Sequence, residues 1–393
     1  MCKDIVIVTS ELPFPDNSGG KIYTWGRMKI LKKMGYNITL FSSCEKDENV
    51  DLYTLKKVCK EVYTYEKKHK MLRALRYGYY PFTVATRRSN KMIKDINKYI
   101  EENQIKLVIA DSAIIASNVK SVSIPIIITQ HNIEYMAFKS MSINAKNLKK
   151  KIAYYREYLL CKMYEKRLYK NKYIKGYTFI SDKDMSFFQE KYPDANCILI
   201  PMGWSDDGSK DVISNTNSKK IIYTGQMNYE PNAQAVIHFA ENIFGTIRKK
   251  IPDAEFYIVG KNPTEPVKEL EKIEGVTVTG YVDSIEKYMQ DCGLVVIPLL
   301  SGGGVKIKLF EALSYKKVVV STDKGYEGTV FKNKQDLFVE NDSDKFAEKC
   351  IEVLSDGDKY KQIGENGYNT LKEIYSWNKI GQRYSKFIED IIK

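Results

Sequence analysis

The chain has 393 residues, of which 43% are hydrophobic and 28% charged, and its formal net charge is +13. This composition is that of a folded globular protein and excludes a disordered chain. The length fits two domains of about 150 to 200 residues each, and no stretch of about 18 apolar residues is present that could cross a bilayer.

Seven cysteines are scattered along the chain without any Cys-x-x-Cys pair. This pattern favours a reducing compartment, with neither a structural zinc site nor a disulfide framework. The apolar run near the N-terminus is too short and too soon interrupted by turn residues for a secretion signal. We therefore expect a cytoplasmic protein.

Strands and helices alternate in the first half of the chain. Residues 5–8 form an apolar, β-branched run typical of a buried parallel strand. A turn-rich loop with Gly19 and Gly20 follows, and helical spacing of apolar residues then extends from 21 to 34. Further strands are predicted at residues 38–42, 107–110, 124–129, 176–181 and 197–201. This order indicates an open α/β sheet, in which ligands bind at the carboxyl ends of strands, where Gly19 and Gly20 lie.

Polar residues follow the predicted strand at 124–129. His131, Asn132 and Glu134 come directly after it, in the position of functional residues in such a sheet. A capping or buried structural histidine is the competing interpretation. We expect the other two histidines, His69 in a lysine run and His238 in a predicted helix, to be structural.

Residues 204–220 are polar, lack apolar periodicity and indicate a linker. We therefore expect a first domain over residues 1–203 and a second over residues 221–375. The second begins with a strand at 221–224, a loop containing Gly225 and Met227, a helix at 233–250, strands at 255–259 and 276–279, and the segment Gly280-Tyr281-Val282.

Residues 295–328 carry the strongest functional signal. The pattern predicts an apolar strand at 294–300, a turn of Gly302, Gly303 and Gly304, a helix opened by Lys306 and Lys308, and a strand at 318–321. Glycines let backbone amides approach a ligand, and the helix start and lysines add positive charge, so the segment suits a phosphate. Glu311, about one turn further on, could accept hydrogen bonds from a ribose. The pattern is neither a Walker loop nor a dinucleotide fingerprint, and solvated lysines beside an ordinary turn are the alternative.

The last segment, residues 375–393, has the apolar spacing of an amphipathic helix. Its apolar positions are Trp377, Ile380, Tyr384, Phe387, Ile388 and Ile391.

Positive charge gathers in two tyrosine-rich segments, residues 65–88 and 146–172, and the second contains ten Lys or Arg against two Glu. A helix through the second segment puts five apolar residues on one stripe, and we expect the lysines on the opposite side. The stripe consists of Leu148, Ile152, Tyr155, Leu159 and Met163. Such a surface suits an anionic membrane or an anionic, lipid-linked substrate, with nucleic acid as a weaker alternative. The plainest alternative is a solvated helix whose stripe packs on its own domain.

Four motifs together resemble those of the retaining glycosyltransferases of family 4, and within them the bacterial polysaccharide and lipopolysaccharide sugar transferases. They are PFPDNSGGKIYT at 13–24, TQHNIEY at 129–135, YTGQMNYEPNAQAV at 223–236 and SGGGVKIKLFEALSYKKVVVST at 301–322. The resemblance covers nearly the whole chain. It implies the GT-B fold, in which two Rossmann-like α/β domains face each other across a cleft and the last helix, here 376–393, crosses back to the first domain.

The resemblance also implies roles for the residues in these motifs. The implied nucleoside-binding residues are Gly280, Tyr281, Val282 and Glu311, and the implied donor-phosphate residues are Gly303, Gly304, Lys306, Lys308, Gly225 and Met227. The implied acceptor-side residues are Gly19, Gly20, His131, Asn132 and Glu134, and the implied catalytic residues are His131, Lys306, Lys308 and Glu311. No metal or other cofactor is implied, because lysines and amides stabilise the departing diphosphate. The leaving phosphate takes the acceptor's proton, so the reaction retains configuration without a protein base.

The chain departs from the family pattern at three places. Gly303 stands where many members have a glutamate that contacts the donor sugar, which leaves the donor's identity open. Lys306 replaces an arginine, so the charge is kept but the bidentate fork on phosphate is lost. Lys316-Lys317-Val318 replaces Gly-Lys-Pro before the last of these strands.

We therefore expect a cytoplasmic glycosyltransferase that is peripheral on the inner face of the plasma membrane. It should move a hexose-type sugar from a nucleotide sugar to a glycan or lipid-linked acceptor of surface polysaccharide synthesis. We expect no nucleic-acid partner. A nucleotide-sugar epimerase of the same fold is one rival, with Asp111 and Glu134 as candidate acid and base. A non-catalytic protein that binds nucleotide sugars or glycans is another. An oxidoreductase is disfavoured because the first strand lacks a dinucleotide fingerprint.

Overall fold

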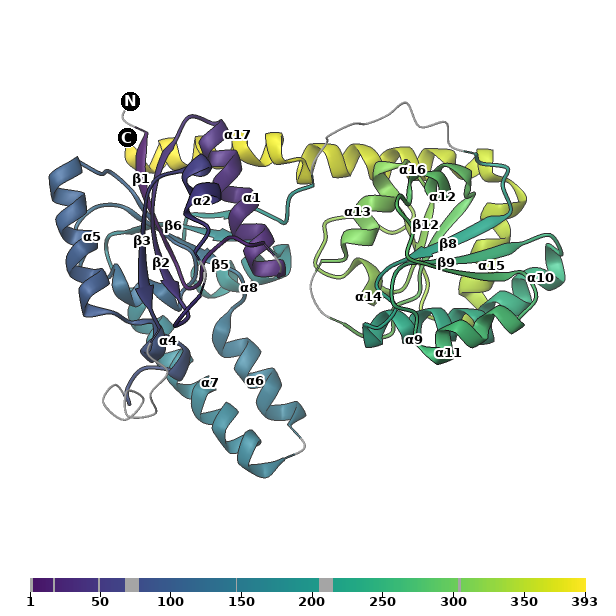
Figure 1. Ribbon diagram of the computed structural model, residues 1–393, viewed down its shortest axis with the longest axis horizontal. Helices are drawn as coiled ribbons and strands as arrows, with labels where there is room; N and C mark the ends of the chain where they lie inside the picture. Colours follow the sequence, from purple (N-terminus) through teal and green to yellow (C-terminus); the bar gives the residue numbers. More distant parts are fainter. Residues whose placement is uncertain are drawn as a thin grey trace. The chain divides into compact units, whose positions relative to one another are not determined.

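The computed structural model describes residues 3–16, 18–48, 50–67, 78–145, 147–204, 215–302 and 305–393. It divides into two compact units (Figure 1). Unit 1 consists of Met1–Gly203 and Trp377–Lys393, and unit 2 of Trp204–Ser376. His69 lies outside the described residues, as do 205–214 of the predicted linker. The start of that linker belongs to unit 2, because the Trp204 amide donates to the Tyr375 carbonyl at 2.7 Å.

Unit 1 is built on a parallel seven-stranded sheet with the order β3-β2-β1-β4-β5-β6-β7. The strands are β1 (Asp4–Thr9), β2 (Asn37–Cys44), β3 (Cys59–Glu66), β4 (Val108–Ala110), β5 (Ile126–Gln130), β6 (Ile174–Phe179) and β7 (Cys197–Leu199). Side chains alternate between the faces, so Ile5 and Ile7 enter one core while Val6 and Val8 enter the other. The sequence prediction missed β3, because its apolar residues alternate with Lys, Glu and Thr at the edge of the sheet.

Helices cover both faces of this sheet. The helices of unit 1 are α1 (Gly19–Lys33), α2 (Leu52–Val58), α4 (Phe82–Arg87), α5 (Asn90–Asn103), the 3-10 helix η1 (Ile115–Asn118), α6 (Glu134–Asn144), α7 (Leu148–Leu168), α8 (Asp182–Lys191) and α17 (Trp377–Ile392). Helices α1, α2 and α17 pack on the core that contains Ile5 and Ile7. Helices α4, α5, α7 and α8 pack on the opposite core.

The C-terminal helix α17 packs against α1 within unit 1. Two glycines make room for its first residue, because a Cβ built at Gly26 or Gly203 would lie 2.2 Å from the Trp377 ring. One turn further along, a Cβ at Gly381 would lie 2.4 Å from Ile30. The apolar spacing noted in the sequence therefore corresponds to the face of α17 that unit 1 buries.

Unit 2 is built on a parallel six-stranded sheet with the order β10-β9-β8-β11-β12-β13. The strands are β8 (Lys220–Thr224), β9 (Glu255–Val259), β10 (Val276–Gly280), β11 (Leu294–Ile297), β12 (Val319–Ser321) and β13 (Phe338–Val339). The helices are α9 (Glu230–Phe239), the π-helix η2 (Ala240–Phe244), α10 (Gly245–Lys250), α11 (Glu265–Lys268), the 3-10 helix η3 (Glu269–Lys272), α12 (Glu286–Asp291), α13 (Ile307–Ser314), α14 (Asp323–Tyr326), α15 (Ser343–Ser355), α16 (Gly357–Thr370) and the π-helix η4 (Leu371–Tyr375). The two parallel sheets confirm the α/β class predicted from the sequence.

Some predicted bounds need correction. The helix predicted at 233–250 starts earlier, at Glu230, because a proline such as Pro231 fits the first turn of a helix and does not interrupt it there. The strand predicted at 294–300 ends at Ile297, after which the chain turns towards the glycines.

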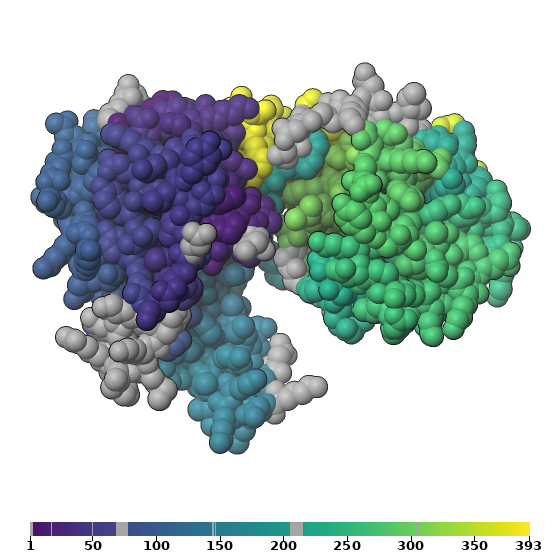
Figure 2. Space-filling model, in the orientation of Figure 1, coloured from purple at the N-terminus to yellow at the C-terminus, as the bar shows by residue number. Residues whose placement is uncertain are grey.

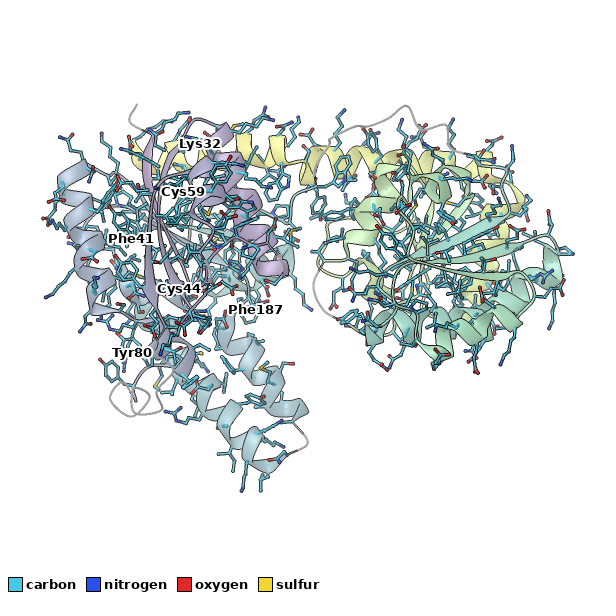
Figure 3. All side chains as sticks on the ribbon, in the orientation of Figure 1. Lys32, Phe41, Cys44, Cys59, Tyr80 and Phe187 are labelled. Atoms are coloured by element: carbon cyan, nitrogen blue, oxygen red, sulfur yellow. The ribbon has the colours of Figure 1, made fainter. Side chains whose placement is uncertain are left out.

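Six cysteines lie in the described residues, and all six are free thiols. Cys44 and Cys59 lie on the neighbouring strands β2 and β3, at opposite ends of unit 1's sheet (Figure 3). Burial raises the pKa of Cys59 to about 12, so this thiol is a packing residue and not a nucleophile.

Candidate functional site

Unit 2 contains a pocket of about 480 Å³ at the carboxyl end of its sheet. The pocket brings together six of the residues predicted to bind a nucleotide sugar: Gly225, Tyr281, Val282, Lys306, Lys308 and Glu311. It lies where the strand order reverses, because β8 is followed outward by β9 on one side and is paired with β11 on the other. Ligands of open α/β sheets bind at such a switch point.

Backbone without side chains forms one wall of this pocket. A Cβ at Gly225 would lie 2.9 Å from both Lys308 Nζ and Asn232 Nδ2, so glycine is what lets these groups reach the loop. Gly260, which the sequence prediction missed, comes so close to Gly225 that its Cβ would lie 1.6 Å from the Gly225 carbonyl oxygen. Gly280, the residue before the lining residue Tyr281, adopts φ +67°, a left-handed conformation that favours glycine.

Lys308 enters the pocket from α13 and contacts neutral groups. Its Nζ donates to Tyr223 Oη at 2.5 Å and to Asn232 Oδ1 at 2.8 Å, and it lies 3.8 Å from the centroid of the Tyr223 ring. Burial lowers the pKa of Lys308 to about 7, against the opposing attraction of Glu311. The site therefore holds an ammonium group that a bound anion would stabilise.

Glu311 and Lys306 complete the polar lining. Glu311 accepts a hydrogen bond from Thr224 Oγ1 at 3.0 Å, and burial raises the pKa of its carboxyl. Lys306 is the residue before α13, and burial lowers the pKa of its ammonium group. Lys261 is a further lysine in the lining. Three lysines and one carboxylate suit an anionic ligand that also carries hydroxyl groups.

Other predicted residues of unit 2 lie elsewhere. The Met227 side chain is fully buried in the core, so it does not reach the pocket. Gly280 precedes the lining residue Tyr281 without lining the pocket itself. Gly303 and Gly304 lie outside the described residues. Sequence reasoning missed Tyr223 and Asn232, although both lie within the motif at 223–236.

Unit 1 contains a smaller pocket of about 150 Å³ at the carboxyl ends of β1, β4 and β5. His131 and Glu134 line it, as do Lys21 and Asp111. The other predicted residues of this side do not line it. Gly19 and Gly20 form the start of α1, where a Cβ at Gly19 would meet no atom within 4 Å, and Asn132 is exposed beside the pocket.

A buried ion pair supports His131. The fully buried Arg27 of α1 donates to Asp111 and to Thr129, and Asp111 also accepts from Thr24 Oγ1 at 2.6 Å. His131 Nε2 lies 3.3 Å from Asp111 Oδ1. Burial alone would raise the pKa of Asp111, but the Arg27 guanidinium and the contact with His131 hold that pKa below its usual value. Asp111 thus orients the imidazole of His131, and the hydrogen bonds from Arg27 and Thr24 hold Asp111 in place.

Glu134 stands beside this network as the first residue of α6. Burial raises the pKa of its carboxyl, opposed by His131 and Arg87. The Tyr23 ring contacts His131 edge to face, with centroids 5.4 Å apart, and so limits rotation of the imidazole. Within the described residues, no group of three or more His, Cys, Asp and Glu side chains could hold a metal ion.

Residues 218–356, which make up most of unit 2, match the family Glycosyl transferases group 1. An uncharacterised 44.6 kDa protein in the cps region of Klebsiella pneumoniae is 25% identical over 96% of this chain and 97% of its own length.

Solved structures share the fold of the whole chain. A glycosyltransferase from Rickettsia africae superposes with a TM-score of 0.63, at 16% identity and with 100% of both chains covered. The HepE protein of Anabaena, solved in complex with UDP, superposes with a TM-score of 0.64, at 12% identity over 99% of this chain and 100% of its own. Residues 218–356 thus resemble the glycosyl transferases group 1, and the whole chain shares the GT-B fold of solved glycosyltransferases.

Proposed function

We propose that this glycosyltransferase moves a hexose-type sugar from a nucleoside-diphosphate sugar to a lipid-linked glycan acceptor of bacterial surface polysaccharide synthesis. We propose further that the reaction proceeds with retention of configuration and without a metal ion. The observation that carries the proposal is the unit 2 pocket, in which Lys306, Lys308 and Glu311 meet at the switch point of a parallel sheet.

The charges of this pocket match the parts of a nucleotide sugar. Lys306 and Lys308 lie at the start of α13, where the diphosphate would also meet the positive end of the helix. Glu311, held by Thr224, would accept hydrogen bonds from the ribose hydroxyls. Tyr281, which is exposed in the lining, would cover the base.

Catalysis then follows from charge stabilisation. As the bond from the sugar to the diphosphate breaks, negative charge grows on the leaving phosphate. Lys308, which neutral groups hold in place, would attract the leaving phosphate more strongly than the intact donor, because the leaving phosphate carries more negative charge. The leaving phosphate would accept the proton of the attacking hydroxyl on the same face of the sugar, which gives retention without a protein base.

In unit 1, we assign His131 and Glu134 to binding of the acceptor or of the donor sugar. Asp111 and Tyr23 fix the orientation of the imidazole, so His131 can present one ring nitrogen in a defined direction. An imidazole held in this way can form a directed hydrogen bond with a hydroxyl group of the substrate.

Two neighbours support the choice of substrates. The relative from Klebsiella pneumoniae lies in a cps region, which favours a polysaccharide acceptor, and the Anabaena protein binds UDP, which favours a uridine nucleotide as the donor. Neither identifies the sugar that this chain transfers.

The epimerase alternative needs an acid and a base beside the sugar. Asp111 is occupied by Arg27, Thr24 and His131, and its lowered pKa makes it a poor acid. Only Glu134 of the two candidates is then available, which favours transfer over epimerisation.

A panel of nucleotide sugars tests the proposal. Thermal shift is measured with UDP, GDP, ADP, CMP and dTDP sugars, without metal, for the wild type, Lys308→Ala and Glu311→Ala. We expect one nucleotide class to stabilise the wild type and neither variant. The matched controls are Lys268→Ala and Glu265→Ala, because this exposed ion pair of 2.6 Å lies on α11 in unit 2 and does not line the pocket.

Stabilisation that persists in both pocket variants would place the nucleotide elsewhere. Conversion of the donor into its epimer, with no release of nucleoside diphosphate, would replace transfer by epimerisation. Binding without any consumption of donor in the presence of bacterial lipid extract would leave a binding protein.

A further inference from the structure

Helices α6 and α7 project from unit 1 as a pair that packs side by side (Figure 1). In the space-filling view their atoms, in teal, form a protrusion below the rest of the unit (Figure 2). Most buried residues of α7 lie in its second half, where Cys161, Tyr164 and Leu168 belong to the unit 1 core. The hairpin therefore has a long surface that its own unit does not bury.

The apolar stripe of α7 lies on that surface. Its members are Leu148, Ile152, Tyr155, Leu159 and Met163, and each is between 42% and 71% exposed. Spacings of three and four residues keep all five on one face of the helix. The buried Tyr164 and Leu168 lie on the opposite face. The interpretation in which this stripe packs on its own domain is therefore wrong, because α7 packs with its other side.

The exposed charge of α7 is entirely positive. Its seven Lys and Arg residues are exposed, whereas Glu157 and Glu165 are buried. Glu157 accepts from the Phe82 amide at 2.7 Å and Glu165 from the Tyr169 hydroxyl at 3.0 Å, so both carboxylates point inward.

The lysines lie beside the stripe, which corrects the sequence expectation that they occupy the opposite side. Lys162 and Lys166 follow Leu159 by three and seven residues and so share its face. Lys149 and Lys151 are exposed next to Leu148 and Ile152. Cations thus border apolar side chains along the length of the helix.

We propose that this face of α7 docks on an anionic lipid bilayer, with the helix lying along the membrane surface. The stripe would enter the boundary between headgroups and acyl chains, and the bordering lysines would contact anionic headgroups. The protein's net charge of +13 acts in the same direction. This inference goes beyond sugar transfer and does not depend on it.

The charges argue against two other occupants. A second copy of the chain would bring seven exposed cations of one α7 against seven of the other, and like charges across an interface disfavour pairing. A nucleic acid would neutralise the lysines but would leave Leu148, Ile152 and Leu159 without apolar partners.

The hairpin also connects this face to the unit 1 pocket. Glu134, which lines the pocket, is the first residue of α6, and α6 packs along α7. A docked hairpin would hold the pocket close to the headgroup layer, where a lipid-linked substrate presents its sugar.

Co-sedimentation with vesicles tests the docking. The full chain is mixed with vesicles of phosphatidylcholine and with equimolar vesicles of phosphatidylcholine and phosphatidylglycerol. We expect binding to the anionic vesicles only. The triple variant Lys149→Gln, Lys151→Gln, Lys162→Gln should bind them about 100-fold more weakly, since each basic residue near an anionic surface contributes about fivefold.

Matched controls separate this face from net charge. Lys91→Gln, Lys94→Gln, Lys98→Gln removes the same number of charges from exposed positions of α5 and should change binding by less than about threefold, the effect of distant, screened charges. The pair Ile152→Asp, Leu159→Asp should abolish binding, whereas Leu52→Asp on α2, at 45% exposure, should leave it unchanged. Circular dichroism checks that each variant is folded, which exposed positions should allow.

Failure of the wild type to bind anionic vesicles would overturn the proposal, as would equal losses in the two triple variants. A dimer in light scattering that Ile152→Asp, Leu159→Asp dissociates, with no vesicle binding, would make a second copy the occupant. The assay contains neither nucleotide nor acceptor, so its failure would leave the proposed sugar transfer standing.

Discussion

The two pockets of this chain differ in the groups that contact their buried cation. In unit 1, the buried cation Arg27 meets the buried carboxylate of Asp111, and the pair is closed by Thr24 and Thr129. In unit 2, the half-buried Lys308 meets the neutral oxygens of Tyr223 and Asn232, and burial lowers its pKa to about 7. The Arg27 charge is paired with a carboxylate, whereas the Lys308 ammonium group donates its hydrogen bonds to neutral oxygens.

This difference separates a structural network from a binding site. A paired buried charge is costly to break, because removal of its partner leaves an unsolvated ion. A buried charge that only neutral groups contact destabilises the free protein, and a bound anion stabilises that charge and with it the folded state. The same type of substitution should therefore have opposite effects on stability in the two units.

The largest effect should come from breaking the balanced pair. Arg27→Met leaves the Asp111 carboxylate buried without its guanidinium, and we expect unit 1 to lose about 3 to 5 kcal/mol of unfolding free energy, measured by urea denaturation. Lys268→Met, which breaks the exposed pair with Glu265, should cost at most about 1 kcal/mol. If Arg27→Met lowered the unfolding free energy no more than this control does, the network would not contribute to the stability of unit 1.

His131 lies at the edge of the balanced network but, in our proposal, contacts substrate. His131→Ala should lower the turnover of donor about 100-fold, the usual effect of losing one preorganised hydrogen bond at a reacting group. The affinity for nucleoside diphosphate should stay unchanged in calorimetry. His238→Ala is the control, because His238 contacts Ser343 and Asn242 in unit 2 and lines neither the unit 1 pocket nor the unit 2 pocket. Equal turnover in both variants would show that His131 has no role in the reaction.

Lys308→Met tests the unbalanced charge. We expect the affinity for nucleoside diphosphate to fall about 10- to 100-fold, as for the loss of one charge-assisted hydrogen bond. The free protein should be as stable as the wild type or more stable, because a desolvated ammonium group is removed. Destabilisation comparable to that of Arg27→Met would show that Lys308 is a structural residue instead.

The pH dependence of binding should be the smallest effect. Lys308 of the free protein loses its proton near pH 7, well below its ordinary pKa of 10.5. A bound diphosphate favours the charged form, so binding above pH 7 takes up a proton and affinity falls with rising pH, by at most about tenfold per pH unit. Titration of UDP-glucose by calorimetry from pH 6 to 9 measures this slope. Lys308→Met should show a flat profile, and a slope that survives in this variant would assign the proton to another group.

Much of unit 2's site could be predicted from the sequence, because each motif carries its own local structure. Lys306, Lys308 and Glu311 lie within six residues at the start of one helix, and Gly225 directly follows a strand. Helix periodicity and strand ends are enough to place them together. Met227 was misplaced because a single residue's direction within a loop has no periodicity to reveal it.

The unit 1 network could not be predicted in the same way. Arg27 and Asp111 are 84 residues apart and come from different elements, so no local pattern joins them. The stripe of α7 shows a related limit. Its spacing is visible in the sequence, but the side on which α7 packs depends on distant partners such as the Phe82 amide, which bonds Glu157 from 75 residues away.

Transfer of a labelled sugar tests the central claim most directly. The wild type and Lys308→Met are incubated with radiolabelled UDP-sugars and bacterial lipid extract, and label in the organic phase is counted together with released UDP. We predict that one UDP-sugar gives equal amounts of lipid-bound label and UDP with the wild type, and at least about tenfold less of both with Lys308→Met. Equal transfer by the two proteins, or no transfer from any nucleotide sugar, would contradict the account.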